Sequence, residues 1–540
     1  MTYRWLTAVA CLAPLFAANG EVKITRAAYL DRVRAVWTAQ LIAVQIGWAF
    51  EHKPAAVSWI DNYDRPMGPA PIDDDWYYEM VLLKALEEKG VGLTVDQLGD
   101  YWDRYNVGTW GSSEQARLNI RRGVRPPLSG HPFFNRLWFT MGNQCRGDLP
   151  GLLAFGLPNL AAELSRKYGH INSYAEGTDG GVLLSAMIAL APFEADPQAL
   201  VRKAIRVLPP TRPHRQAIEM MISLAERGKK PKEIAAAIED RWHTVYPATN
   251  NAVSNGALAV LGVWFGEGDF LKTVNVVFQA ADYTDADCNA AFAGAVVAAM
   301  KGMAAIPERL WKPFQDRIRG DSMGHLKFPM VDESITALSE RTAAVGLKFL
   351  AANGVRISGD TIQLPRPELV QMSDESFSLN EFAERWSSGW RMERAGYGAP
   401  GGGLRNLRGG TFLDGDVLST YPADEVRGMY LWKTVSGRRL RVEVAADPGR
   451  SWQLQIFANN ERVVSEVISG GPAAASETDD RPLSVPELEY VRGKEARRWK
   501  EIVVDLKKYD GREMAVRLYQ TVLLKDNVPG NAYWRGLRVD

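Results

Sequence analysis

Two acidic clusters, far apart in the chain, are the residues best suited to chemistry. Asp73, Asp74 and Asp75 precede one apolar segment, and Asp285 and Asp287 precede another. A helix cap requires one carboxylate, whereas adjacent carboxylates repel each other unless positive charge offsets them. If folding joins the clusters, their oxygens form a cage for hard divalent cations, which indicates metal-assisted hydrolysis. The alternative is that each cluster only caps its own helix.

Six further polar residues are candidates for the same site, although each has an ordinary structural explanation. Glu51 follows the apolar segment 33–50, and a glutamate at a helix end is commonly solvated. A lone histidine at a helix edge is usually structural. The sequence has no P-loop, no serine nucleophile elbow, no H-E-x-x-H motif and no zinc cysteine pairs. The six candidates are Glu51, Asn143, Gln144, Arg146, His243 and Asn255.

Helices are expected to position these residues over roughly the first 350 positions. Apolar residues recur at helical spacing, as in Met80, Leu83 and Leu86 before the stop at Gly90. Alanine, glycine and valine dominate 289–303, and small residues let helices approach closely, so this helix should be central. The predicted helices are 30–50, 76–88, 152–167, 182–190, 216–227, 232–242 and 289–303.

The hydrophobic pattern changes to period two in the last third of the chain. Leu440, Val442 and Val444 alternate with charged residues, and 452–456, 514–518 and 533–539 also alternate. Asp, Asn, Gly and Pro separate these segments and indicate turns. The pattern predicts an all-β sandwich, jelly-roll-like, over 376–540, with 351–375 as a connector.

Residues 1–20 have the composition of an export signal. A short basic start precedes an apolar run too short to span a bilayer, and 18–20 form a small-x-small cleavage site. The signal predicts a secreted or periplasmic protein, and a buried first helix is the alternative. Cleavage would leave Cys145 and Cys288 as the only thiols. Two cysteines do not make a disulfide framework, although a single bridge between them is possible.

Five segments, taken in chain order, resemble the motifs of the ADP-ribosylglycohydrolase family. They are similar to its first helix with a terminal glutamate, its first aspartate motif, its central G-x-Q-x-R segment, its late aspartate motif and its usual ending. Each motif is weak alone, and their order makes the resemblance specific. In this chain they are 31–51, 72–76, 142–146, 285–289 and 307–311.

The resemblance implies an all-α ADP-ribosylglycohydrolase-like catalytic domain, which we assign to 21–350, with a binuclear magnesium site. Mn²⁺ and Ca²⁺ are alternatives to Mg²⁺. Glu51 matches the family's acid/base glutamate, and we assign Asp75 to both the catalytic and the metal-binding sets. The implied ligands are Asp73, Asp74, Asp75, Asp285 and Asp287. The expected substrate-binding residues are Asn143, Gln144, Arg146, His243 and Asn255.

The chain departs from the family pattern at several positions. Asp73 and Trp76 stand where the first motif has threonines, and Cys288 replaces the threonine that closes the late motif. A thiol is a poor ligand for Mg²⁺, so one metal subsite is expected to be altered. Ser173 replaces an expected histidine, and the pair at 43–44 is Ala-Val instead of Gly-Asp. Recognition of ADP-ribose is therefore expected to differ.

These observations predict an exported, metal-dependent hydrolase that cleaves a glycosidic bond at an anomeric carbon. Export and the C-terminal sandwich, which resembles galactose-binding-like domains, favour a glycan or glycoconjugate over an ADP-ribosylated acceptor. Release of ADP-ribose is the first alternative, and a non-catalytic sugar-binding protein with a degenerate site is the second. The formal net charge is +0, so neither nucleic acid nor a membrane is an expected partner. The expected partner is a small-molecule or glycan substrate.

Overall fold

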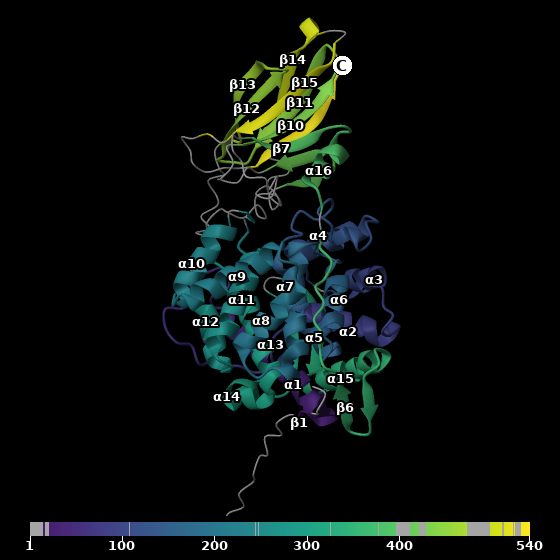
Figure 1. Ribbon diagram of the computed structural model, residues 1–540, viewed down its shortest axis with the longest axis vertical. Helices are drawn as coiled ribbons and strands as arrows, with labels where there is room; N and C mark the ends of the chain where they lie inside the picture. Colours follow the sequence, from purple (N-terminus) through teal and green to yellow (C-terminus); the bar gives the residue numbers. More distant parts are fainter. Residues whose placement is uncertain are drawn as a thin grey trace, which may run out of the picture.

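The computed structural model describes most of the chain. The described residues are 15–16, 21–106, 108–243, 245–246, 248–323, 326–375, 377–395, 411–420, 428–471, 497–509, 512–521, 523 and 531–540. The expected export signal, residues 1–20, lies outside them except for strand β1 (Leu15–Phe16). Figure 1 shows most of the helices gathered in one body and the two large sheets in another. No helix among the described residues has both the length and the apolar content needed to cross a bilayer.

Helix α13 (Ala286–Lys301) lies at the centre of the helical body and is buried along almost its whole length. It packs against α1 (Arg26–Gly47), α11 (Ala252–Gly266) and α12 (Phe270–Phe278). Its small residues permit this close packing, since a Cβ added at Gly294 would lie 2.9 Å from the ring of Phe270. The central position expected for 289–303 agrees with this arrangement.

The other helices of the body surround this centre (Figure 1). They are α2 (Asp74–Lys89), α3 (Val95–Tyr105), α4 (Gly111–Arg121), α5 (Asp148–Leu153), α6 (Pro158–Gly169), α7 (Glu176–Leu190), α8 (Pro197–Ala204), α9 (Pro213–Glu226), α10 (Pro231–Trp242), α14 (Glu308–Trp311) and α15 (Ile335–Ala352). The segment 152–167, predicted as one helix, is divided between α5 and α6. Gly156 between them has a φ of +86°, which interrupts helical geometry, and Pro158 begins the next helix.

Short strands accompany the helices, which the helical pattern did not indicate. β3 (Arg317–Met323) and β4 (Leu326–Ser334) form an antiparallel hairpin. A second sheet joins β2 (Val22–Thr25) to β6 (Thr361–Leu364), and β6 to β5 (Arg356–Ser358). The predicted connector 351–375 therefore contains the hairpin of β5 and β6. This hairpin joins the helical body, because β6 also pairs with β2, the strand that precedes α1.

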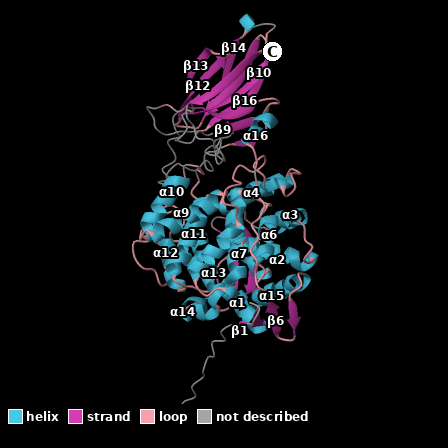
Figure 2. Ribbon diagram, in the orientation of Figure 1, coloured by secondary structure: helices cyan, strands magenta, loops and turns pink. Residues whose placement is uncertain are grey.

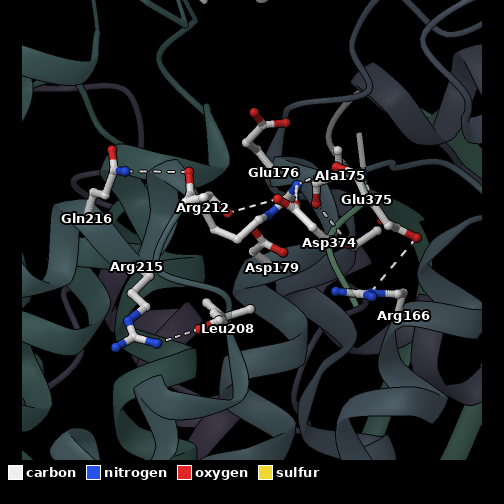
Figure 3. A network of polar contacts seen from close by, with 12 residues as sticks. Arg166, Ala175, Glu176, Asp179, Leu208, Arg212, Arg215, Gln216, Asp374 and Glu375 are labelled. Carbon is white, nitrogen blue, oxygen red and sulfur yellow. Dashed lines mark hydrogen bonds and ion pairs between the residues drawn. The ribbon is translucent and has the colours of Figure 1, made fainter. Parts of the chain in front are cut away.

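The rest of the connector, residues 365–375, lies against the helical body. Arg212, at the start of α9, donates from Nη1 to Asp374 Oδ1 at 3.1 Å and to the Glu375 carbonyl oxygen at 2.6 Å. His170 Nε2 lies 2.6 Å from Glu375 Oε1. Figure 3 shows Asp374 and Glu375 entering this network beside Asp179 of α7. The connector is therefore a fixed part of the fold.

The C-terminal region is a sandwich of two five-stranded antiparallel sheets, so the predicted fold class is confirmed (Figure 2). Short helix α16 (Leu379–Trp386) precedes its strands. The rings of Trp452 and Trp534, from opposite sheets, lie 5.0 Å apart. One sheet has the order β13 (Glu461–Ser469), β12 (Ser451–Ala458), β15 (Met514–Thr521), β10 (Gly428–Val435), β7 (Arg391–Ala395), and the other β14 (Lys500–Asp505), β11 (Arg439–Ala446), β16 (Ala532–Val539), β9 (Val417–Thr420), β8 (Phe412–Asp414).

Candidate metal centre

The two acidic clusters meet in one cavity of the helical body. The cavity has a volume of about 420 Å³, and its wall combines carboxylates, two thiols and aromatic rings. The acidic residues on the wall are Glu51, Asp73, Asp74, Asp75, Asp285 and Asp287. All of the metal and catalytic candidates expected from the sequence therefore face the same space.

The first cluster is held by the start of α2. Asp73 caps the helix, because its Oδ1 accepts a hydrogen bond from the backbone N–H of Asp75 at 3.2 Å. Asp74 and Asp75 occupy the first turn, where the positive end of the helix dipole stabilises carboxylates. The capping explanation thus applies to Asp73 alone, and the other two carboxylates remain for a different role.

The second cluster is held by the start of α13, where no side-chain cap forms. Asp285 precedes the helix, and its backbone N–H donates to Asn255 Oδ1 at 3.1 Å. The same amide oxygen accepts from Asn289 Nδ2 at 2.8 Å, and Asn289 Oδ1 accepts from Gln144 Nε2 at 3.2 Å. This buried chain of amides fixes the first turn of α13, which carries Asp287.

Glu51 reaches the cavity because two loops pair beside it. The backbone N–H of His52 donates to the Thr284 carbonyl at 2.9 Å, and that of Tyr283 donates to the Lys53 carbonyl at 2.8 Å. The loop that follows α1 is thereby fixed against the loop that precedes α13. Glu51 is thus brought close enough for its charge to act on Asp73, Asp74 and Asp287.

Gly47 permits the close approach of α1 to the second cluster. A Cβ at this position would lie 2.6 Å from Cα and 2.9 Å from Cβ of Asp287. We expect Gly47→Ala to displace the first turn of α13, lower the stability by about 1–3 kcal/mol and weaken metal binding, although no polar group is removed. Thermal unfolding and calorimetric titration with Mn²⁺ measure the two effects. Gly68→Ala is the matched control, because its Cβ would meet nothing within 4 Å; equal behaviour of the two variants would contradict the prediction.

Two thiols complete the wall of the cavity. Cys288 Sγ donates to Asp75 Oδ1 at 2.6 Å and lies 3.3 Å from Cys145 Sγ. Cys145 Sγ is also 3.4 Å from the Met141 carbonyl oxygen, to which it donates. Asp75 lies in the first turn of α2 and Cys288 in the first turn of α13, so this contact directly links the two helix starts that carry the acidic clusters.

Burial and mutual repulsion raise the pKa values of four of the clustered aspartates. Burial raises the pKa of Asp73 to about 7; the backbone N–H of Asp75 opposes the rise, and the charges of Glu51 and Asp285 add to it. Burial is also the main cause that lifts three other pKa values well above the usual aspartate value, those of Asp74, Asp75 and Asp287. These four carboxyls favour the protonated form more than ordinary aspartates do, unless a cation takes the place of the proton.

Stability without metal should fall as pH rises. An aspartate whose folded-state pKa is raised from 3.8 to about 7 contributes stability that is present below the lower value and is lost through the higher one. We expect the melting temperature of chelator-treated protein to drop between about pH 4 and about pH 7. Mg²⁺ should restore more stability at the higher pH, since it binds the deprotonated carboxylates. Asp73→Asn should lessen the drop over this range, while the other raised carboxyls still titrate, and a profile unchanged by this substitution would refute the assignment.

The five residues expected to contact substrate lie outside the cavity wall that the described residues form. Gln144 and Asn255 belong to the amide chain behind α13. Asn143 donates to the Thr178 carbonyl at 2.9 Å, and Arg146 donates to Asn172 Oδ1 at 2.5 Å. His243 pairs with Glu239 at 2.9 Å at the end of α10. All five have protein partners, and Gln144 and Asn255 directly support the start of α13; contact with substrate stays a prediction.

Several wall residues were not among the sequence candidates. Trp48 and Trp110 expose 46% and 39% of their surface and line the cavity with Tyr78 and Arg65. Ser112, in the first turn of α4, lies on the same wall. Serine is common at helix starts, so Ser112 and Ser113 indicate the beginning of α4. The sequence positions of Trp110 and Ser112 have no regular spacing from the aspartates, so sequence alone could not place these residues on the cavity wall.

The residues fit a divalent cation. Asp287 Oδ1 is buried without a hydrogen-bond partner. Two groups of three residues could each hold an ion, because within each group one ligand atom per residue lies within 4.8 Å of the other two. One is Asp75, Cys145 and Cys288, and the other is Asp285, Asp287 and Cys288. Carboxylate oxygens suit Mg²⁺, Mn²⁺ or Ca²⁺, whereas the thiols do not.

A comparison with protein-family models identifies the family of the chain. The family model for ADP-ribosylglycohydrolase matches residues 25–345. A solved structure titled "ADP-ribosylglycohydrolase-related protein complex" is similar to the chain at 16% identity and a TM-score of 0.39, covering 60% of this chain and 98% of its own. No curated protein matches. Because the family model covers more than half of the sequence, the chain belongs to the ADP-ribosylglycohydrolase family, a family of hydrolases.

Proposed function

We propose that the protein is an exported, divalent-cation-dependent hydrolase that cleaves a glycosidic bond at an anomeric carbon, with a glycan or glycoconjugate as substrate. The observation that carries the proposal is the convergence of two helix N-termini, with their carboxylates, and Glu51 in one cavity. Export rests on the signal-like residues 1–20. Sugar binding by the C-terminal sandwich stays a prediction.

The cation would be held by Asp73, Asp74, Asp285 and Asp287, with Asp75 at the contact between the clusters. When bound, it would supply positive charge for sugar hydroxyls and lower the pKa of a coordinated water. Glu51 is the carboxyl assigned to proton transfer, either from the attacking water or to the leaving oxygen. The residues of the wall would orient the substrate so that the proton moves over a short distance between Glu51 and the reacting oxygen.

The polar and aromatic character of the wall supports a sugar. Trp48 and Trp110 contribute exposed aromatic surface against which a pyranose or furanose can lie, although Arg65 and Lys53 already lie over the Trp48 ring. Among the described wall residues, Arg65 is the only arginine or lysine. Its Nη2 already donates to Gln45 Oε1 at 2.9 Å, and its guanidinium lies 4.9 Å from the centre of the Trp48 ring. Few cationic groups are therefore available for a diphosphate.

The second candidate is hydrolysis of an ADP-ribosyl bond, and one observation favours it. Helix α4 begins at Gly111 on the cavity wall, and its N-cap residue Trp110 makes no side-chain cap. The N–H groups at such a helix start bind anions, including the phosphates of nucleotides. ADP-ribose should therefore compete with the true substrate if this candidate is correct, and should not compete if the substrate is a neutral glycan.

The test is a hydrolysis screen of aryl glycosides, glycans and ADP-ribosyl conjugates, each with and without chelator. Glu51→Gln should reduce turnover by about 10²–10⁴-fold while the affinity for Mg²⁺ changes little. Glu340→Gln, on the exposed face of α15, is the matched control and should retain full activity. Cleavage that is insensitive to chelator, or a Glu51→Gln variant with normal turnover, would overturn the proposal. A chain that binds no divalent cation would instead be the non-catalytic, degenerate form.

A further inference from the structure

The pair of thiols has a geometry that magnesium chemistry does not explain. Cys145 and Cys288 are separated by 143 positions, yet their sulfur atoms lie 3.3 Å apart inside the cavity. Cys288 also donates to Asp75 Oδ1 at 2.6 Å. One donor atom from each of these three residues lies within 4.8 Å of the other two. Three elements, α2, α13 and the 3₁₀ turn Met141–Arg146, thus converge on one small volume.

The distance between the sulfurs fits a shared ion better than a covalent bond. A disulfide requires about 2.05 Å between sulfurs. Two thiolates at about 2.3 Å from one tetrahedral Zn²⁺ are about 3.8 Å apart. The observed 3.3 Å needs an opening of about half an ångström to admit the ion. The contact between Cys288 and Asp75 opens in the same movement, because the ion replaces the thiol proton that now joins them.

We propose that Cys145, Cys288 and Asp75 form a sulfur-rich subsite that binds a borderline-soft divalent ion of the Zn²⁺ class beside the carboxylate subsite. Thiolates select Zn²⁺ over Mg²⁺, and three protein ligands leave a fourth position open. Binding requires both thiols and the Asp75 carboxyl to be deprotonated, and every proton that they hold passes to solvent. The proposal rests on the proposed cation site in this cavity and not on the reaction performed there.

A second observation supports an ion at this place. Cys288 also groups with Asp285 and Asp287, whose oxygens lie within 4.8 Å of its sulfur. Asp287 is 4% exposed, and its Oδ1 has no hydrogen-bond partner. Leaving a buried carboxylate oxygen unsatisfied is costly unless something positive pairs with it. Cys288 is therefore shared by a sulfur-rich group and an oxygen-rich group. The two sides of the centre differ in their ligand atoms, sulfur on one side and carboxylate oxygen on the other.

The test uses the full chain, stripped of metal, fully reduced and titrated with Co²⁺ as a spectroscopic probe. We expect a thiolate-to-cobalt charge-transfer absorption in the near ultraviolet that saturates at one ion per chain. Zn²⁺ should displace the cobalt, and excess Mg²⁺ should not. Cys145→Ser and Cys288→Ser should each lose the absorption, and their affinity for Zn²⁺ should fall by more than the roughly 10–100-fold typical of outer-shell changes. Asp74→Ala, on the oxygen-rich side, should retain the absorption.

Thiol counting gives an independent readout that does not depend on activity. One Zn²⁺ should protect Cys145 and Cys288 of the reduced chain from an aromatic disulfide reagent, whereas Cys11, where residues 1–20 are retained, should stay reactive. No charge-transfer band together with full thiol reactivity in the presence of Zn²⁺ would overturn the proposal. Spontaneous formation of a Cys145–Cys288 disulfide in preference to Zn²⁺ binding would also overturn it. An inactive chain that still shows the band would count only against the proposed function.

Discussion

Replacing Asp74 or Asp287 by alanine should abolish Mg²⁺-dependent turnover and lower the affinity for Mg²⁺ or Mn²⁺ by more than about 100-fold. The reason is that each variant removes a carboxylate from a cluster built by two helix starts, and the remaining ligands cannot replace it. Loss of an outer-shell partner alone already costs about 10–100-fold in affinity. Calorimetric titration measures the affinity, and the hydrolysis screen measures the turnover.

The fold should survive these substitutions. Burial and the charges of neighbouring acids raise the pKa of both carboxyls in the metal-free state, so removing either one relieves repulsion and removes a buried acid. We therefore expect the chelator-treated variants to melt at or above the temperature of the chelator-treated parent. Asp240→Ala, at an exposed position of α10, is the control for loss of a carboxylate. Tight Mg²⁺ binding in both site variants would show that the cluster is not the cation site.

The aspartates could be found from the sequence because their chemistry is local. Asp73, Asp74 and Asp75 are adjacent, and Asp285 and Asp287 are one residue apart, so each cluster shows an excess of charge over what a cap needs. Their convergence could be stated only as a condition. It depends on contacts such as the Thr284–His52 hydrogen bond and the absence of a side chain at Gly47, and these involve distant positions.

The residues around the clusters could not be assigned in the same way. Asn255 is polar and at a helix start, which suits a substrate contact, but its amide instead binds the backbone of Asp285 and the side chain of Asn289. The pairing of Cys145 with Cys288 has no sequence signature, since two cysteines give no spacing pattern. The docking of the connector also depends on tertiary partners, because Asp374 and Glu375 look like ordinary solvated acids until Arg212 is placed beside them.

Arg212 provides the second large effect, and it concerns stability. Arg212 Nε donates to Asp179 Oδ2 at 2.8 Å, and the two side chains are 3% and 0% exposed. Burial raises the pKa of Asp179 to about 6, against the opposing charge of Arg212. We expect Arg212→Met to lower the unfolding free energy of the helical body by about 3–5 kcal/mol, because it leaves a buried charge unpaired and releases the connector. Urea unfolding followed by far-ultraviolet circular dichroism measures the change.

Two comparisons show whether the unpaired charge is the cause. Arg202→Met removes an exposed arginine paired with Glu226, and such pairs are worth about 0–1 kcal/mol. The double variant Arg212→Met with Asp179→Leu should recover most of the loss, since it removes the charge together with its partner. The single Arg212 variant should also be less impaired at low pH, because the raised folded-state pKa of Asp179 stabilises the protonated form and this stability is lost as pH rises. A loss independent of pH, with no recovery in the double variant, would instead place the effect in the tether from Arg212 to Asp374 and Glu375.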